Sequence, residues 1–323
     1  MSFLFRCCQY LIGEEIMNKR KSCIGCIIVT YNRIDKLKKT LDSYAAQNFL
    51  PLYLIVVNNA STDGTKEYLD EWQKVDAGFE KIVITSHINL GGSGGYFLGE
   101  KEAISRGADW IMIADDDAYP QDDYLEGMQC YMDSHDMERV SIICGKVLQK
   151  GTCLNFHRGV WKSRWAIDFY SFSPEANYKK KEFYPDFVSY VGIVVKKSAL
   201  LKVGLVNKDN FIWYDDTEHT YRLSQVGKII CIPKFTIIHD VDDTHDGLSW
   251  KTYYGFRNSL NFFRVHYPLH YPIILIILLC KTLLLPLKRR SLDEIKIRLT
   301  AIKDSMFQNM GEHTVYKPGW RPK

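Results

Sequence analysis

Residues 110–117 read WIMIADDD, an apolar run that ends in three consecutive aspartates. An unbroken apolar run of this length is typical of a strand that is buried on both faces of a parallel sheet. In an open α/β sheet the ligand site lies outside the carboxyl ends of the strands. The aspartates therefore mark the functional edge of the predicted sheet.

The three carboxylates repel one another unless a cation gathers them. Alternate side chains of an extended segment point the same way, so Asp115 and Asp117 are expected to face together and Asp116 elsewhere. Such a pair suits Mg²⁺ or Mn²⁺ that bridges a pyrophosphate. The alternative interpretation is an acidic surface turn followed by Pro120.

Before this stretch, strand-length apolar runs alternate with segments of helical period. This alternation is typical of a mainly parallel, Rossmann-like sheet with helices on its faces. The predicted strands are residues 26–30, 52–57 and 81–85, and the predicted helices are residues 35–47, a segment ending near Trp72 that Ser61 or Thr62 caps, and residues 96–106.

After this stretch the pattern is less regular. A polar stretch, residues 173–186, predicts a mobile loop, and the acidic stretch 240–247 predicts a flexible one. The predicted strands are near residues 152–161 and 188–195, then 228–232 and 235–239, and the predicted helix is residues 215–225.

Composition restricts the class of protein and its compartment. The net charge is only +4 and the sequence has no long basic run, so no nucleic-acid partner is expected. Nine scattered cysteines indicate a reducing cytosol rather than a disulfide framework. Residues 1–16 lack the features of a signal peptide, and translation could begin at Met17, so residues 1–20 are interpreted as a leader outside the fold.

The last part of the chain changes character. Residues 267–287 are mostly apolar but are broken by prolines and Lys281, and Lys288, Arg289 and Arg290 follow. The uninterrupted apolar core, residues 273–280, is too short to span a bilayer. We expect residues 266–323 to form a helical region with an interfacial helix, and a helix packed on the domain core is the open alternative.

Two further motifs carry chemistry. Residues 89–95, NLGGSGG, let backbone approach a phosphate or sugar closely, although the G-x-G-x-x-G spacing is absent. Residues 211–218, FIWYDDTE, place carboxylates at a helix start beside aromatic side chains. Helix capping explains one or two of these acids, whereas the aromatics suit a sugar ring whose hydroxyl a carboxylate could deprotonate.

With these motifs in order, the chain resembles glycosyltransferase family 2 over nearly all of residues 25–264. Residues 29–33, VTYNR, and residues 56–65, VVNNASTDGT, are similar to the family's nucleotide-binding segments, and the triple aspartate is similar to its metal-binding DxD. The acceptor half follows the family's spacing at Val203-Gly204-Leu205, Phe211, Asp215-Asp216, Glu218, Arg222, Gly227 and His239.

The resemblance implies a GT-A fold, an α/β domain with a mixed central sheet, over residues 21–265, and it assigns a role to each matching residue. Asn58 stands where many relatives have aspartate, and its amide oxygen can still accept the N3–H of a pyrimidine. Asp216 is the implied catalytic base, and the implied metal ligands are Asp115, Asp117 and His239. The implied donor contacts are Thr30, Tyr31, Asn32, Arg33, Asn58, Asn59, Asp63, Asn89, Gly91, Gly92, Asp115 and Asp116, and the acceptor or sugar contacts are Trp213, Tyr214, Asp215 and Glu218.

The implied activity is inverting, Mn²⁺- or Mg²⁺-dependent transfer of a sugar to a glycan or lipid-linked oligosaccharide, at the cytoplasmic face of the plasma membrane. NLGGSGG, DDD, WYDDTE and the late Tyr253-Tyr254 with Arg257-Asn258 are most similar to galactofuranosyltransferases and next to rhamnosyltransferases, so UDP-galactofuranose is expected ahead of dTDP-rhamnose. A nucleotidyltransferase would want a glycine-rich basic loop where this chain reads TYNR. A non-catalytic sugar-nucleotide-binding protein would have lost the base or the metal residues.

Overall fold

The computed structural model describes residues 22–162, 170–241, 247–286 and 291–322. Within these residues, a nine-stranded mixed sheet has the order β3-β2-β1-β4-β11-β6-β12-β5, with β7 paired to β6, and a smaller sheet has the order β10-β8-β9. The strands are β1 (Ile24–Thr30), β2 (Tyr53–Asn58), β3 (Glu80–Thr85), β4 (Trp110–Asp115), β5 (Ala118–Pro120), β6 (Val140–Gln149), β7 (Thr152–Cys153), β8 (Arg158–Trp161), β9 (Tyr170–Phe172), β10 (Phe187–Val188), β11 (Ile193–Lys196) and β12 (Lys228–His239). The helices are α1 (Ile34–Ala45), α2 (Thr65–Trp72), α3 (Gly91–Ile104), α4 (Tyr124–Ser134), α5 (Lys197–Val203), α6 (Asp215–Ser224), α7 (Trp250–His266), α8 (Tyr271–Leu283) and α9 (Leu292–Phe307), with short 3-10 turns η3 (Asn155–His157), η4 (Glu175–Lys179) and η5 (Lys208–Asn210).

The central strands are apolar throughout because each of them is buried on both faces of the sheet, where it packs in a separate hydrophobic core. Ile28 and Val56 pack with α1 and α4 on one face of the sheet. Ile27 and Val57 pack with α3 and α5 on the other face. This alternation explains the unbroken apolar runs in the sequence, and it confirms the predicted strands of the first half.

The sheet is parallel in its first half and mixed in its second. β1 pairs in parallel with β2 and β4, whereas β11 runs antiparallel to both β4 and β6. The mixed α/β sheet that the GT-A resemblance implies is therefore present. β12 runs from residue 228 to residue 239 with an irregular register, so the two short strands predicted there are one strand with a bulge.

Two local expectations were wrong. Helix α3 begins at Gly91 rather than at residue 96, since the side chains of Asn59 and Asn89 accept hydrogen bonds from the backbone N–H groups of Leu90 and Gly91. Gly64 precedes α2, and neither Ser61 nor Thr62 caps it. The polar stretch 173–186 contains the short helix η4 and the bridge from Phe183 to Cys231, and its mobility stays a prediction.

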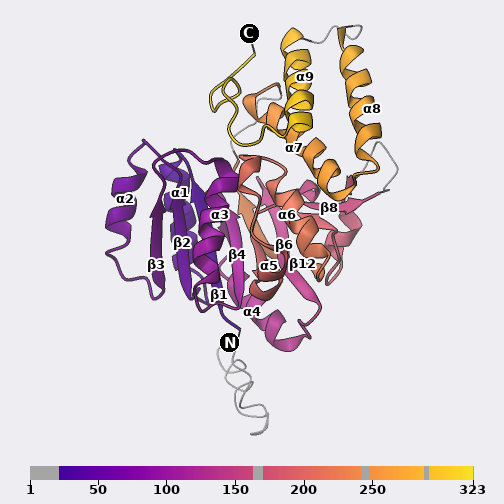
Figure 1. The fold of residues 1–323 in the computed structure, drawn as a ribbon. Coiled ribbons are helices and arrows are strands. Elements are labelled where there is room, and N and C mark those ends of the chain that lie inside the picture. The colour runs from indigo at the N-terminus through magenta and orange to yellow at the C-terminus, as the bar shows by residue number, and fades with distance from the viewer. Residues whose placement is uncertain (1–21, 163–169, 242–246, 287–290, 323) are drawn as a thin grey trace.

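The C-terminal helices lie above the carboxyl ends of the parallel strands, at the opposite end of the sheet from the start of β1 (Figure 1). Helix α7 packs on α9 through Tyr253, Tyr254 and Ile297, which are fully buried. The Tyr253 hydroxyl donates to Asp304 Oδ2 at 2.7 Å. Helix α9 is thus joined to α7 by this hydrogen bond as well as by apolar packing. Of the predicted loop 240–247, residues 242–246 lie outside the described part.

Helix α8 is apolar along its length and packs against the domain on one side only. Ile273, Ile276 and Leu283 are more than half exposed, and they share one stripe of the helix with Leu279. No helix in the described part of the chain is both long and apolar enough to cross a membrane.

Candidate active site

Two of the three aspartates and His239 form one cluster at the carboxyl edge of the sheet. His239 ends β12, and its Nε2 lies 3.3 Å from Asp117 Oδ1 and 3.8 Å from Asp115 Oδ2. One ligand atom from each of the three residues lies within 4.8 Å of the other two. The sequence placed these three side chains together, and the structure brings them together.

Asp116 points elsewhere, as predicted, but the cause is the turn that Asp116 and Asp117 form between β4 and β5 rather than alternation along a strand. Its carboxylate accepts hydrogen bonds from Thr30 Oγ1 at 2.7 Å and Arg33 Nη1 at 3.0 Å, and the same Arg33 nitrogen reaches Asp117 Oδ2 at 2.7 Å. Burial raises the pKa of Asp116 to about 6, and the Arg33 guanidinium opposes this shift. Arg33 therefore offsets part of the repulsion among the three acids.

The Asp115, Asp117 and His239 cluster fits a divalent cation. Asp117 Oδ1 is buried and has no hydrogen-bond partner that meets the geometric criteria among the described residues, and His239 Nε2 lies 3.3 Å from it. A buried carboxylate oxygen without a donor is costly unless a cation completes it. Two carboxylates and one imidazole are a donor set that Mn²⁺ accepts readily and that Mg²⁺ can use.

Asp215 and Asp216 form a second acidic pair at the first turn of α6. Ser93 Oγ donates to Asp215 Oδ2 at 3.0 Å, and the backbone N–H of Thr217 donates to Asp216 Oδ1 at 2.6 Å. Burial raises the pKa of Asp215 to about 6. Burial, followed by repulsion from Asp215, raises the pKa of Asp216 to about 7. A carboxylate with such a pKa is suited to accept a proton near neutral pH.

One helix connects the two acidic clusters. Ser93 holds Asp215, and Tyr96, three residues later on α3, donates its hydroxyl proton to Asp115 Oδ1 at 2.5 Å. Residues three apart on a helix lie on the same face, about 5–6 Å apart at their Cβ atoms. Neither Ser93 nor Tyr96 was among the site residues predicted from the sequence. Their spacing within and just after NLGGSGG was the available signal.

The segment that precedes Asp215 has an unusual backbone. Phe211, Trp213 and Tyr214 have φ angles of 66°, 63° and 66°, a region that favours glycine. Such residues cost on the order of 1–3 kcal/mol each and persist where the surrounding structure holds them. Trp213 is 46% exposed and is available to a sugar ring. Tyr214 is the N-cap residue of α6, whose first helical residue is Asp215.

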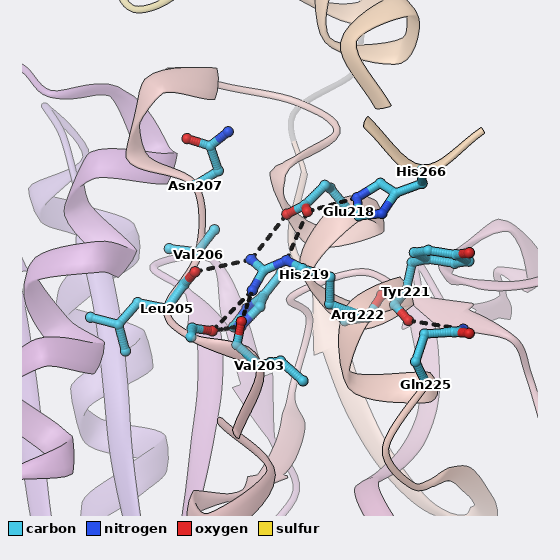
Figure 2. A network of polar contacts seen from close by, with 12 residues as sticks. Val203, Leu205, Val206, Asn207, Glu218, His219, Tyr221, Arg222, Gln225 and His266 are labelled. Atoms are coloured by element: carbon cyan, nitrogen blue, oxygen red, sulfur yellow. Dashed lines mark hydrogen bonds and ion pairs between the residues drawn. The ribbon is translucent and has the colours of Figure 1, made fainter. Parts of the chain in front are cut away.

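Glu218 is committed to contacts within the protein (Figure 2). Arg222 donates to its two carboxylate oxygens at 2.7 and 3.0 Å, and His266 Nε2 lies 3.0 Å from Oε1. Although burial opposes the shift, the contacts with His266 and Arg222 lower the pKa of Glu218 to about 2. Arg222 also donates to the carbonyl oxygens of residues 203–205. Glu218 thus ties α6 to α7, and its sugar contact stays a prediction.

Most of the expected donor contacts shape the loops at the ends of β1 and β2. Asn58 Oδ1 accepts from the backbone N–H of Ser61, and Asn32 Oδ1 accepts from that of Thr62. Asp63 accepts from the backbone N–H of Ile34. Tyr31 is 37% exposed beside them. These side chains lie around one edge of the sheet, and their contacts with a donor stay predictions.

Contacts within the protein require a glycine at one position of the glycine-rich turn. Gly91 has a φ of 71°, and a Cβ there would lie 2.0 Å from the Phe211 carbonyl oxygen. Asn59 donates to Asn89 Oδ1 and to the Gly91 carbonyl oxygen, which fixes the turn. At Gly92 the nearest atom to an added Cβ would be Asp215 Oδ2, at 3.9 Å. Gly92 therefore leaves the approach to the acidic pair open.

The model of the family described as Glycosyl transferase family 2 matches residues 26–196. Galactofuranosyltransferase GlfT1 of Mycobacterium tuberculosis is 33% identical over 207 residues, which are 62% of this chain and 64% of that protein. The match therefore spans less than two thirds of that relative. The dTDP-rhamnosyl transferase RfbF of Shigella flexneri is 24% identical over 315 residues, 88% of this chain and 96% of that protein.

Solved structures share the fold at low sequence identity. GalNAc-T7 with UDP, GalNAc and Mn²⁺ aligns with a TM-score of 0.60 at 15% identity, covering 77% of this chain and 48% of that one. S. aureus TarS 1-349 in complex with UDP-GlcNAc aligns with a TM-score of 0.58 at 14% identity, covering 88% of this chain and 80% of that one. These likenesses establish the GT-A architecture.

The cluster geometry predicts which acid holds a cation. Asp117→Ala should lower the affinity for Mn²⁺ by at least about tenfold, because the ion loses one of three protein ligands that water replaces poorly. Titration calorimetry with Mn²⁺ measures this. Asp116→Asn is the matched control, since Asp116 points toward Thr30 and Arg33. Equal Mn²⁺ affinity in Asp117→Ala and the wild type would show that these acids do not hold the ion.

Proposed function

The chain belongs to glycosyl transferase family 2 and is a glycosyltransferase, and from this premise we propose that it is an inverting, divalent-metal-dependent enzyme that transfers galactofuranose from UDP to a glycan hydroxyl. Rhamnose from dTDP is the second candidate. Family membership favours sugar transfer over nucleotidyl transfer and over a purely binding role.

One observation carries the proposal: two acidic clusters with different chemistry are joined by one helix. Tyr96 holds Asp115 of the cation cluster, and Ser93 holds Asp215 of the acidic pair. The first cluster presents ligand atoms for a cation. The second presents a carboxyl group whose pKa lies near neutral pH. A displacement at a sugar carbon needs both kinds of group, one on each side of the reacting centre.

Asp115, Asp117 and His239 would hold the cation. When bound, such an ion supplies Lewis-acid stabilisation of the negative charge on the departing nucleoside diphosphate. Arg33 pairs with Asp116 and Asp117 and adds a positive charge beside the expected diphosphate position. The Asn58 amide would meet the pyrimidine ring at the end of β2.

Asp216 is the proposed base. Its carboxylate accepts the proton of the acceptor hydroxyl, whose oxygen forms the new bond to the anomeric carbon while the bond to the diphosphate oxygen breaks on the opposite face. This single displacement inverts the configuration at that carbon. The exposed Trp213 indole beside Asp216 offers an apolar face to the acceptor or donor sugar.

Asp216→Asn should lower turnover by about 10²-fold or more, the scale of a lost general base, while UDP affinity in Mn²⁺ is retained. Turnover of the wild type should fall as the pH drops below about 7, because the base must be ionised. Initial rates across pH measure both effects. If Asp215→Asn lost its activity while Asp216→Asn kept it, Asp215 and not Asp216 would be the base.

The Asp216 carboxyl group also predicts the direction in which the stability of the protein changes with pH. Its pKa is about 7 in the folded protein, against about 3.9 for an unperturbed aspartate. Folding therefore takes up a proton between these values, and stability falls as the pH rises through this window. Asp216→Asn removes that loss, so its Tm at pH 8 should equal or exceed that of the wild type.

The donor sugar is tested directly. Support for galactofuranose comes from the 33% identity to GlfT1 and from the NLGGSGG and WYDDTE segments. Purified protein with Mn²⁺ and a glycan acceptor should release UDP from UDP-galactofuranose faster than it releases dTDP from dTDP-rhamnose. Turnover with dTDP-rhamnose and none with UDP-galactofuranose would replace the first candidate with the second.

We further propose that the exposed stripe of α8 binds the cytoplasmic membrane surface, where a lipid-linked glycan would be presented. Ile273, Ile276 and Leu283 leave their apolar surface uncovered in the described structure. Lys288, Arg289 and Arg290 follow in the sequence and lie outside the described residues. Each basic residue near an anionic surface contributes about 1 kcal/mol, so reversible peripheral binding is expected.

Point variants test this proposal better than truncation, because α9 packs on α7. Ile276→Ser with Leu283→Ser should lose flotation with phosphatidylglycerol vesicles, while Val75→Ser, which alters an equally exposed residue beyond α2, should not. High salt should release the wild type. Equal flotation of the wild type, the double variant and Val75→Ser would contradict the proposal. If the wild type were a dimer and the double variant a monomer, the stripe would instead be an interface between two copies of the chain.

A further inference from the structure

We propose that helix α7 is the template that holds the strained segment 211–214, and that Asn258 is the positioning residue through which this segment sets the place of Asp216. The inference rests on the proposed role of Asp216 as the base. It assigns a task to Arg257-Asn258, a motif that neither the cation cluster nor the acidic pair accounts for.

The segment does not favour its own conformation. Phe211, Trp213 and Tyr214 all have positive φ angles, and none of them is glycine or asparagine. Phe211 has φ 66° and ψ −59°, a backbone turn that is rare for an L-residue. Contacts from outside the segment must therefore keep it in place.

Asn258 supplies those contacts to the backbone. Its buried Nδ2 donates to the carbonyl oxygens of Asn210, Ile212 and Trp213 at 2.9, 3.0 and 2.8 Å. Arg257 Nε donates to Asn258 Oδ1 at 3.0 Å, which sets the orientation of the amide. One side chain thus contacts three carbonyl groups of the irregular turn, of which that of Asn210 also accepts from the Ile212 N–H and from Arg257.

Other residues of α7 contact the side chains of the segment. The Phe211 ring stacks on Tyr254 with centroids 5.1 Å apart. The Trp213 indole covers Gly255 so closely that a Cβ there would lie 2.9 Å from its Cε3 atom. Positions 254, 255 and 258 share one face of a helix, so α7 presents a continuous surface to the segment.

The same surface extends to the start of α6. The Tyr214 ring lies 5.8 Å from that of Phe262, which is on the next turn of α7. Tyr214 is the N-cap residue of α6, and Asp216 is on its first turn. A shift of the segment would therefore move the acidic pair. The cation cluster is held by Tyr96 and Arg33 instead, so donor binding should not follow that shift.

The test compares two variants of the template with a control on the same helix. Asn258→Asp keeps the size of the side chain but replaces the donor with an oxygen that repels the three carbonyl groups. Gly255→Ala pushes on the Trp213 indole while raising the helix propensity of α7. Tyr253→Phe removes a buried hydrogen bond to Asp304 on α9 and does not touch the segment.

Asn258→Asp should lower kcat by about 10- to 100-fold, the effect of misplacing a reacting group by about 1 Å, with UDP affinity in Mn²⁺ at the wild-type value. Gly255→Ala should lower kcat/KM for the acceptor by about tenfold with no fall in Tm. Tyr253→Phe should lower Tm and keep kcat. A purely structural role would give the reverse ranking, because activity would then follow Tm.

Wild-type kcat and acceptor KM in Gly255→Ala would overturn the inference even if Asn258→Asp failed to fold. Loss of UDP affinity together with kcat in Asn258→Asp would also overturn it, since the template would then serve the whole site. Failure of the proposed function is distinct, because the wild type itself would show no glycosyl transfer.

Discussion

The repulsion among Asp115, Asp116 and Asp117 at the end of a buried strand is the constraint around which the site is arranged. Burial makes each charge costly, and adjacency in the chain prevents the three from moving apart. Asp115 ends β4, and the turn that Asp116 and Asp117 form before β5 directs Asp116 toward Thr30. Arg33 pairs with Asp116 and Asp117, and Asp115 and Asp117 meet His239 from β12. This arrangement leaves a candidate cation site.

The two halves of the sheet contribute different parts of the chemistry. The parallel strands β1, β2 and β4 bring Thr30, Asn58 and Asp115 to one edge by register alone. The mixed half supplies His239, and the turn into α6 supplies the acidic pair. Helix α3 joins them through Ser93 and Tyr96. One helix thus helps to fix the separation of Asp115 and Asp215.

The C-terminal helices belong to this arrangement as well. Arg257 on α7 donates to the carbonyl oxygens of Asn210 and Gly311, so it joins the segment before Asp215 to the last part of the chain. Helix α8 stands on the same side of the sheet with an uncovered apolar stripe (Figure 1). An acceptor presented at a membrane surface would therefore arrive on the side where the acidic pair lies.

The sequence by itself determined the strands of the parallel half of the sheet, because unbroken apolar runs of strand length are typical of strands buried on both faces. The motif order also identified the family and the His239 partner. The tertiary structure alone decided where α3 begins, that Glu218 pairs with His266, and that Phe211, Trp213 and Tyr214 adopt positive φ angles. Each of these outcomes depends on hydrogen bonds from residues far away in the chain, such as those that Asn258 donates across 45 to 48 positions. Local periodicity carries no information about such partners, since it reports which face a side chain occupies and not what lies opposite it.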